Sequence, residues 1–83
     1  GDRNKTYGSP TQNFSDTAVL WNTYLRTKLG PGKQIDPGDV AVLIILLKVA
    51  RMVASPKRDN WVDIAGYAGC GFEADLDSGK IDE

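Results

Sequence analysis

The longest apolar stretch of the chain runs through residues 36–54, DPGDVAVLIILLKVARMVA. Apolar side chains are unbroken over residues 40–47, and no glycine or proline follows Gly38 within the stretch. A strand is the alternative, because valine and isoleucine are abundant, but the run exceeds the usual strand length. Lys48 and Arg51 also stand one turn apart, as on one face of a helix. The pattern therefore predicts a helix over residues 36–54.

The start of this stretch has the features of a helix N-terminus. Asp36 can accept a hydrogen bond from the free N–H groups of the first turn, and Pro37 suits the first helical position. Asp39 adds negative charge at the positive end of the helix. Because apolar residues occupy most of the circumference, we expect this helix to be central and buried on several sides. A membrane span requires about 20 apolar residues, whereas Lys48 interrupts this run, so we expect no membrane association.

A second helix is predicted over residues 13–29, where apolar side chains recur at steps of four, three and four. It should end at Gly30, which can adopt the left-handed cap conformation and is followed by a proline. The recurring apolar residues are Phe14, Ala18, Trp21 and Leu25. The polar residues beside this stripe, interpreted as a solvated face, are Asp16, Asn22, Arg26 and Lys28.

A third helix is predicted over residues 60–74, with Asp59 as its cap. Its apolar stripe consists of Trp61, Ile64, Ala65, Ala68 and Phe72. The segment also contains three glycines, each of which costs about 0.5–1 kcal/mol relative to alanine inside a helix. We expect this cost to be offset by close approach of a neighbouring helix. The three glycines are Gly66, Gly69 and Gly71.

These elements predict an all-α fold, a three-helix domain around a central apolar helix. Residues 1–12 form an N-terminal arm, residues 13–74 a single helical domain and residues 75–83 an acidic, disordered tail. A domain of 83 residues has a small core. We therefore expect a homo-oligomer, in which other copies cover part of the central helix. Light scattering should then give a mass above the 9.0 kDa of the monomer.

Composition excludes several classes of function. The net charge is −1, and the chain has no cluster of basic residues of the kind that binds DNA, so no DNA partner is expected. Without histidine and with only one cysteine, the chain has no internal disulfide, zinc site or serine triad. That cysteine, Cys70, is interpreted as a small packing residue. A reducing cytosol and the absence of a recognisable leader segment predict a cytoplasmic protein.

The candidate chemistry lies where the central helix ends and the third helix begins. Lysines and arginines at this corner could bind phosphoryl oxygens, while two aspartates hold a hydrated magnesium ion. The alternative is a set of interhelical salt bridges, for example from Arg51 to Asp63. Sequence spacing leaves both open. Tyr7 either pins the N-terminal arm or closes over a ligand. The candidate ligand-binding residues are Lys48, Arg51, Lys57, Arg58, Asp59, Asp63 and Tyr7.

The motifs YGSPTQNF, DVAVLIILLKVARMVASP and DNWVDIAGYAGCG, together with the Trp21 helix, resemble a family of small proteins encoded by bacteriophages and prophages. The same pattern is distantly similar to the all-α nucleotide pyrophosphohydrolases of MazG type and to a phage nucleotide-modification-associated domain. The resemblance implies an all-α fold and a nucleotide ligand. MazG-type enzymes bind magnesium through glutamate-rich pairs on two facing helices, and this chain has only Asp39, Asp59 and Asp63 at comparable places.

We therefore expect a phage protein that binds a phosphorylated nucleotide, with sequestration favoured over hydrolysis. No residue is assigned a catalytic role, no cofactor is required, and magnesium is an optional companion of the nucleotide. If the protein is an enzyme, the resemblance implies a MazG-like nucleotide pyrophosphohydrolase. The alternative function is a non-catalytic helical interaction module that binds a host or phage protein through exposed apolar surface.

Overall fold

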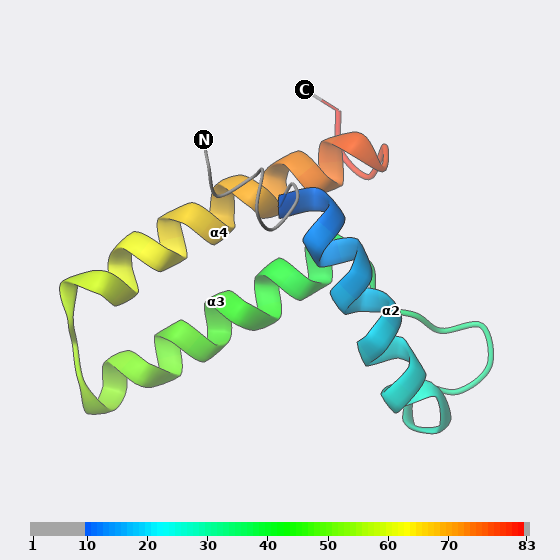
Figure 1. The fold of residues 1–83 in the computed structure, drawn as a ribbon, viewed down its shortest axis with the longest axis horizontal. Coiled ribbons are helices and arrows are strands. Elements are labelled where there is room, and N and C mark those ends of the chain that lie inside the picture. Colours follow the sequence, from blue (N-terminus) through cyan, green and yellow to red (C-terminus); the bar gives the residue numbers. More distant parts are fainter. Residues whose placement is uncertain (1–9, 83) are drawn as a thin grey trace.

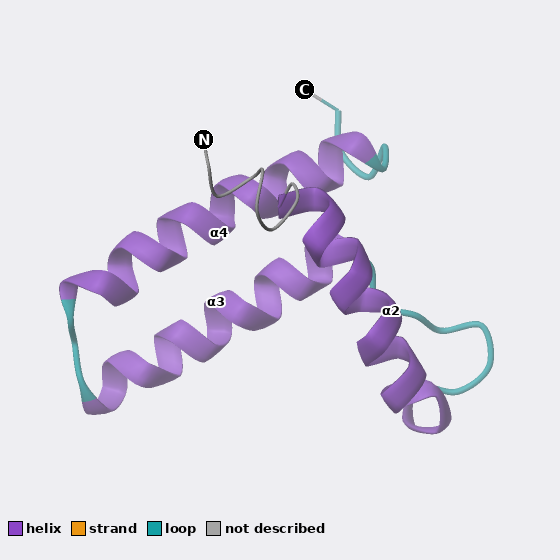
Figure 2. Cartoon of the chain, viewed as in Figure 1, coloured by secondary structure: helices purple, strands orange, loops and turns teal. Residues whose placement is uncertain are grey.

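The computed structural model describes residues 10–82, which form three α-helices joined by loops (Figure 1). The helices are α2 (Pro10–Leu29), α3 (Pro37–Ala54) and α4 (Arg58–Asp77). This described part contains no strand, as Figure 2 shows. The prediction of an all-α fold with three helices is confirmed.

Helices α3 and α4 form an antiparallel hairpin, and α2 crosses it at the end where α3 begins and α4 ends (Figure 1). Three contacts define how the two hairpin helices lie against each other. They join Gly38 to Asp75, Ala41 to Gly71 and Lys48 to Asp63. As the residue number rises along α3, the number of the contacted residue on α4 falls, as antiparallel packing requires. The opposite end of the hairpin, at residues 55–57, carries no third helix (Figure 1).

The start of α3 is capped as the sequence predicts. The Asp36 side chain accepts a hydrogen bond from the backbone N–H of Asp39 at 2.8 Å, and the Asp39 side chain accepts one from the backbone N–H of Asp36 at 3.0 Å. This reciprocal pair is a capping box, with Pro37 at the first helical position. At the end of α2, Gly30 adopts a φ of 89°, which confirms its role as the left-handed cap.

The start of α4 differs from its prediction. The helix begins at Arg58, so Asp59 lies within the first turn and its predicted role as the cap is wrong. The cap position belongs to Lys57, whose side chain makes no capping hydrogen bond. Instead, the Asn60 side chain donates to the carbonyl of Ser55 at 3.0 Å and ties the two helix ends together. Asp59 still lies at the positive end of the helix, where its charge is favourable.

The other ends of α2 and α4 extend beyond their predicted bounds. Helix α2 begins at Pro10 rather than residue 13, since proline is well tolerated in the first turn. Helix α4 continues to Asp77, and the chain then turns back through Gly79, which has a φ of 76°. The backbone N–H of Lys80 donates to the carbonyl of Asp75 at 2.9 Å. Residues 75–81 thus differ from the predicted disordered tail, because a long-range contact of Lys80 orders a segment of low apolar content.

The core lies where α2 crosses the hairpin. The Phe14 and Tyr67 rings pack with centroids 6.0 Å apart. Cys70 is partly buried against this cluster, as expected for a packing residue. The buried core residues are Phe14, Ala18, Val40, Ala41 and Ala74. The side chains packed around it are Trp21, Ile35, Ile44, Tyr67 and Cys70.

Burial of α3 is limited to one side. Its fully buried side chains, Val40 and Ala41, lie in the first two turns, next to α2 and α4. The opposite side of the helix is exposed and apolar, and includes Leu46, which is 56% exposed, and Val53, which is 87% exposed. The expected burial on several sides is therefore not reached within one chain.

The glycines of α4 are explained only in part by helix packing. A Cβ on Gly71 would lie 2.9 Å from the Cβ of Ala41, so the predicted close approach holds at this position. Gly66 and Gly69 face open space. Within one chain, no helix packing offsets the loss of helix stability that these two glycines cause relative to alanine. Across residues 10–82, no helix combines the length and hydrophobicity needed to cross a lipid bilayer.

Candidate functional site

The candidate site lies at the end of the hairpin that carries no third helix. We call it the basic end, defined by Lys48, Arg51, Lys57 and Arg58. Lys48 Nζ lies 3.1 Å from Asp63 Oδ2 and joins α3 to α4. The Lys48 side chain is 15% exposed, whereas that of Asp63 is 43% exposed. An interhelical salt bridge was one of the two sequence interpretations, but the cation is Lys48 rather than Arg51.

Register explains this choice of partner. Along the antiparallel pair, Lys48 lies level with Asp63, and Arg51 lies almost one turn closer to the connection between the helices. The carbonyl of Arg51 accepts the hydrogen bond from the Ser55 N–H, at 2.9 Å, that closes the last turn of α3. Arg51 is therefore offset from Asp63 along the hairpin, towards the connection between the helices.

The other cations of the basic end are exposed, and no acidic side chain in the described part of the chain pairs with them. Arg51, Lys57 and Arg58 form no ion pair with any residue of the 10–82 region. Asp59 is likewise exposed and unpaired there. Four cations and two carboxylates thus meet at this end, although the net charge of the chain is −1. Such a surplus suits an anionic group, and a phosphate in particular.

The carboxylates of the basic end are few. Within the described residues, no three His, Cys, Asp or Glu side chains come close enough together to hold a metal ion. Asp59 and Asp63 are one turn apart on α4, while Asp39 lies at the far end of α3. Tyr7, the remaining candidate ligand residue, falls outside the described residues.

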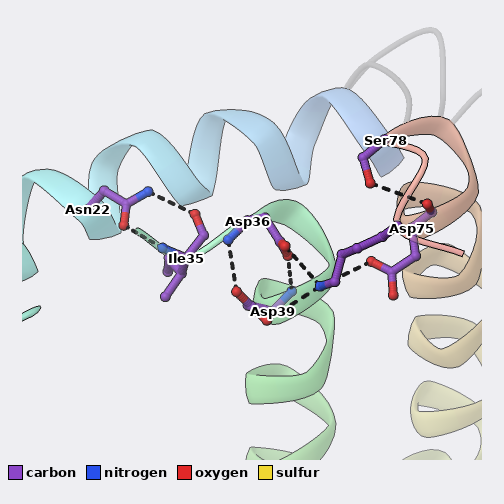
Figure 3. Close-up of polar contacts among 7 residues, drawn as sticks. Asn22, Ile35, Asp36, Asp39, Asp75 and Ser78 are labelled. Carbon is purple, nitrogen blue, oxygen red and sulfur yellow. Dashed lines mark hydrogen bonds and ion pairs between the residues drawn. The ribbon is translucent and has the colours of Figure 1, made fainter. Parts of the chain in front are cut away.

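A second polar cluster, at the opposite end of the hairpin, was not predicted (Figure 3). Lys80 Nζ lies 2.8 Å from Asp36 Oδ2, 3.8 Å from Asp39 Oδ1 and 3.5 Å from Asp75 Oδ1. The hydrogen bond from Lys80 lowers the pKa of Asp36, against the opposing effect of partial burial. The same hydrogen bond raises the pKa of Lys80. The lysine thereby fastens the C-terminal turn to the start of α3.

Asp75 in this cluster is only partly compensated. Its Oδ1 atom is buried and accepts no hydrogen bond, although Lys80 is within ion-pair distance. The negative charge of this carboxylate is therefore compensated only by electrostatic attraction, from the Lys80 ammonium group and from the positive N-terminus of α3 nearby. The cluster holds the two helix ends together and leaves no cation free for a ligand.

The linker before α3 is held by an amide clamp. The Asn22 side chain donates to the Ile35 carbonyl and accepts from the Ile35 N–H, both at 2.9 Å (Figure 3). The interpretation of Asn22 as part of a solvated face is wrong, because the linker returns along α2 and offers it a backbone partner. Between α2 and this linker lies an open hollow of about 870 Å³, bordered by Arg26 and Lys33. None of the candidate ligand residues within the 10–82 region borders the hollow.

Comparison with known proteins places this chain in a family. The family described as "domain of unknown function (DUF6378)" matches residues 1–75. The chain belongs to the DUF6378 family. It is similar to the Gene 55 protein of Mycobacterium phage D29, with 48% identity over 71 residues that cover 84% of this chain and 43% of the relative. It is also similar to the Gene 55 protein of Mycobacterium phage L5, with 44% identity over 70 residues that cover 83% of this chain and 42% of the relative.

These matches confirm the resemblance to small phage proteins. The DUF6378 chain spans less than half the length of these two relatives. No solved structure matches it. The names of these two relatives assign no activity.

Proposed function

We propose that this DUF6378 chain binds the phosphate group of a nucleotide at the basic end of the α3–α4 hairpin. The observation that supports the proposal is the surplus of positive charge. Arg51, Lys57 and Arg58 are exposed around one neutral pair, Lys48 with Asp63. The planar fork of arginine matches two phosphoryl oxygens at once, and lysine adds a compact charge.

In this proposal the Lys48–Asp63 pair positions the site. Lys48 is largely buried and joins the two helices, so it fixes the spacing of the exposed cations above it. Asp63 keeps nearly half of its side chain exposed. With Asp59 one turn earlier, it could hold a hydrated magnesium ion that accompanies the phosphates, because magnesium commonly keeps several waters and takes one or two carboxylates.

We propose sequestration of the nucleotide rather than hydrolysis. Hydrolysis of the MazG type would require several carboxylates fixed around metal ions. Asp39 is the only acidic residue of α3, and it lies about 13 Å along the helix axis from Lys48 at 1.5 Å per residue. We therefore expect no release of pyrophosphate from nucleoside triphosphates with magnesium or manganese.

A thermal-shift titration tests this proposal with ATP, GTP and cyclic nucleotides, each with and without magnesium. A ligand at 100 times its dissociation constant stabilises the folded state by about 2.7 kcal/mol. Arg51→Met should abolish the shift and leave the unliganded stability unchanged, since Arg51 has no ion pair in the described chain. Arg26→Met, at the end of α2, is the matched control and should keep the shift. No shift with any nucleotide, or an equal shift for Arg51→Met, would reject the proposal.

The second candidate is a non-catalytic interaction module, supported by the exposed apolar side of α3. Large apolar side chains exposed on one helix are typical of surfaces that another protein covers. We propose that this side is covered in a homo-oligomer, which would make α3 the central apolar helix of the assembly. The two candidates are separable, because an interaction module would show no nucleotide shift while its association would depend on the apolar side of α3.

A further inference from the structure

The exposed side of α3 carries a regular apolar stripe. Its four members follow one another at steps of four, three and four, the spacing at which residues of one helix form a seam with another helix. Lys48 and Arg51 each stand two residues beyond a stripe position, about 200° around the helix at 3.6 residues per turn. Both charges therefore lie off the stripe. Its members are Val42, Leu46, Val49 and Val53, which are 53%, 56%, 44% and 87% exposed.

We infer that this stripe is the seam with a second copy of the chain, and that the two α3 helices run antiparallel. This inference rests on the homo-oligomer proposed above. The spacing reads the same in both directions, so a two-fold axis between Leu46 and Val49 satisfies both copies equally. Val42 then lies opposite Val53 of the partner subunit, and Leu46 lies opposite Val49 of the partner subunit. Such self-complementary contacts are what a two-fold symmetric interface requires.

The opposite charges at the two ends of α3 favour an antiparallel orientation, and they favour a second copy of the chain as the partner that covers the stripe. At the start of α3, three carboxylates surround one lysine, Lys80. At its other end lie the exposed cations Arg51, Lys57 and Arg58. Antiparallel pairing brings the acidic end of each copy to the basic end of the other, whereas parallel pairing would bring like charges together. The three carboxylates are those of Asp36, Asp39 and Asp75.

The pairing also adds a carboxylate to each basic end. Asp39 precedes Val42 by three residues and continues the stripe towards the start of the helix. When Val42 lies opposite Val53 of the partner subunit, Asp39 is level with the connection that contains the partner's Lys57. Its side chain is 44% exposed, with Oδ2 accepting the capping hydrogen bond from the Asp36 N–H and Oδ1 lying 3.8 Å from Lys80 Nζ. The partner's Asp39 would thus add negative charge beside Lys57, while Arg51 and Arg58 keep their positive charge for the phosphate.

Sedimentation equilibrium of the 83-residue chain tests the association, with twice the monomer mass of 9.0 kDa expected. Leu46→Glu should give a monomer at the same concentration, and circular dichroism should show that its helices are retained. Leu20→Glu on α2 is the matched control, because Leu20 is 69% exposed and lies off α3. A monomeric wild type, or a dimer that persists in Leu46→Glu, would overturn the inference.

Cross-linking tests the orientation in a Cys70→Ser background. A mixture of Val42→Cys and Val53→Cys chains should form a disulfide-linked dimer under mild oxidation, and neither chain alone should do so. Cross-linking of Val42→Cys with itself would indicate a parallel seam and contradict the inference. Nucleotide shifts measured on the monomeric Leu46→Glu variant separate a failure of the seam from a failure of the phosphate site.

Discussion

Gly38, in the first turn of α3, lies directly against the carboxylate of Asp75 near the end of α4. A Cβ at Gly38 would overlap with Asp75 Oδ1, which is buried. The same carboxylate is 3.5 Å from Lys80 Nζ, so it has little freedom to move away. Gly38 is itself buried, and its lack of a side chain lets the two helix ends and the C-terminal turn meet.

Gly38→Ala should therefore destabilise the fold by about 1–3 kcal/mol, the usual cost of overpacking. The measurement is the free energy of unfolding in urea. The cost should fall in an Asp75→Ala background, because the overlapping oxygen is then absent. Gly66→Ala is the matched control, since a Cβ there meets open space, and it should stabilise the helix by about 0.5–1 kcal/mol. Equal effects at the two glycines would contradict the close packing described here.

The amide clamp between Asn22 and Ile35 should contribute to stability and to the order of the linker. Asn22→Ala leaves a partly buried N–H and carbonyl of Ile35 without their partner, at a cost of about 1–3 kcal/mol. Amide hydrogen exchange at Ile35 should accelerate in this variant beyond the change in global stability.

Thr23→Ala is the control for the clamp. The Thr23 hydroxyl bonds only to the Val19 carbonyl within its own helix, and its removal should change stability by less than about 0.5 kcal/mol. If Ile35 exchanged equally fast in both variants, the clamp would not hold the linker.

The Lys48–Asp63 pair should contribute more than an exposed salt bridge and less than a buried one. Exposed pairs contribute about 0.2–1 kcal/mol, and breaking a buried pair costs about 3–5 kcal/mol. With one partner largely buried and the other nearly half exposed, Lys48→Met should cost about 1–2 kcal/mol. A double-mutant cycle with Asp63→Ala measures the coupling between the two residues. A coupling of zero would mean that the pair does not hold the hairpin.

The contact between Lys80 and Asp36 should make stability depend on pH. The pKa of Asp36 is held below its ordinary value of 3.8, so its contribution is present above that pH and is lost as pH falls through the lowered pKa. The pKa of Lys80 is raised, so its contribution is present below the ordinary value of 10.5 and is lost as pH rises through the raised pKa. The contact should therefore stabilise the fold throughout the neutral range.

Urea unfolding as a function of pH tests this dependence. The stability difference between wild type and Lys80→Met should be constant near neutral pH and shrink below pH 3.8. Lys33→Met, which removes an exposed lysine of the linker, is the control and should show no such change. A difference that persists unchanged into acid would show that Lys80 acts through packing alone.

Much of the fold is determined locally, and the sequence predicts it well for that reason. Helix period, the capping box of Asp36 and Asp39, and the left-handed Gly30 each involve residues within about one turn of each other. Interactions at such short separations form largely independently of the rest of the chain. The residue types of the basic end were likewise visible, because Lys48, Arg51 and Asp63 lie on predicted helices around a recognisable corner.

Only the tertiary structure decided which of these residues meet. Lys80 and Asp36 are 44 residues apart, and Asn22 and Ile35 are 13 apart, so no local pattern relates them. The choice of Lys48 rather than Arg51 as the partner of Asp63 depends on the antiparallel register, which the close contact of Ala41 with Gly71 helps to define. Burial depends on the same long-range packing. An apolar helix is predicted from its own residues, but which of its sides other helices cover depends on how the chain folds back.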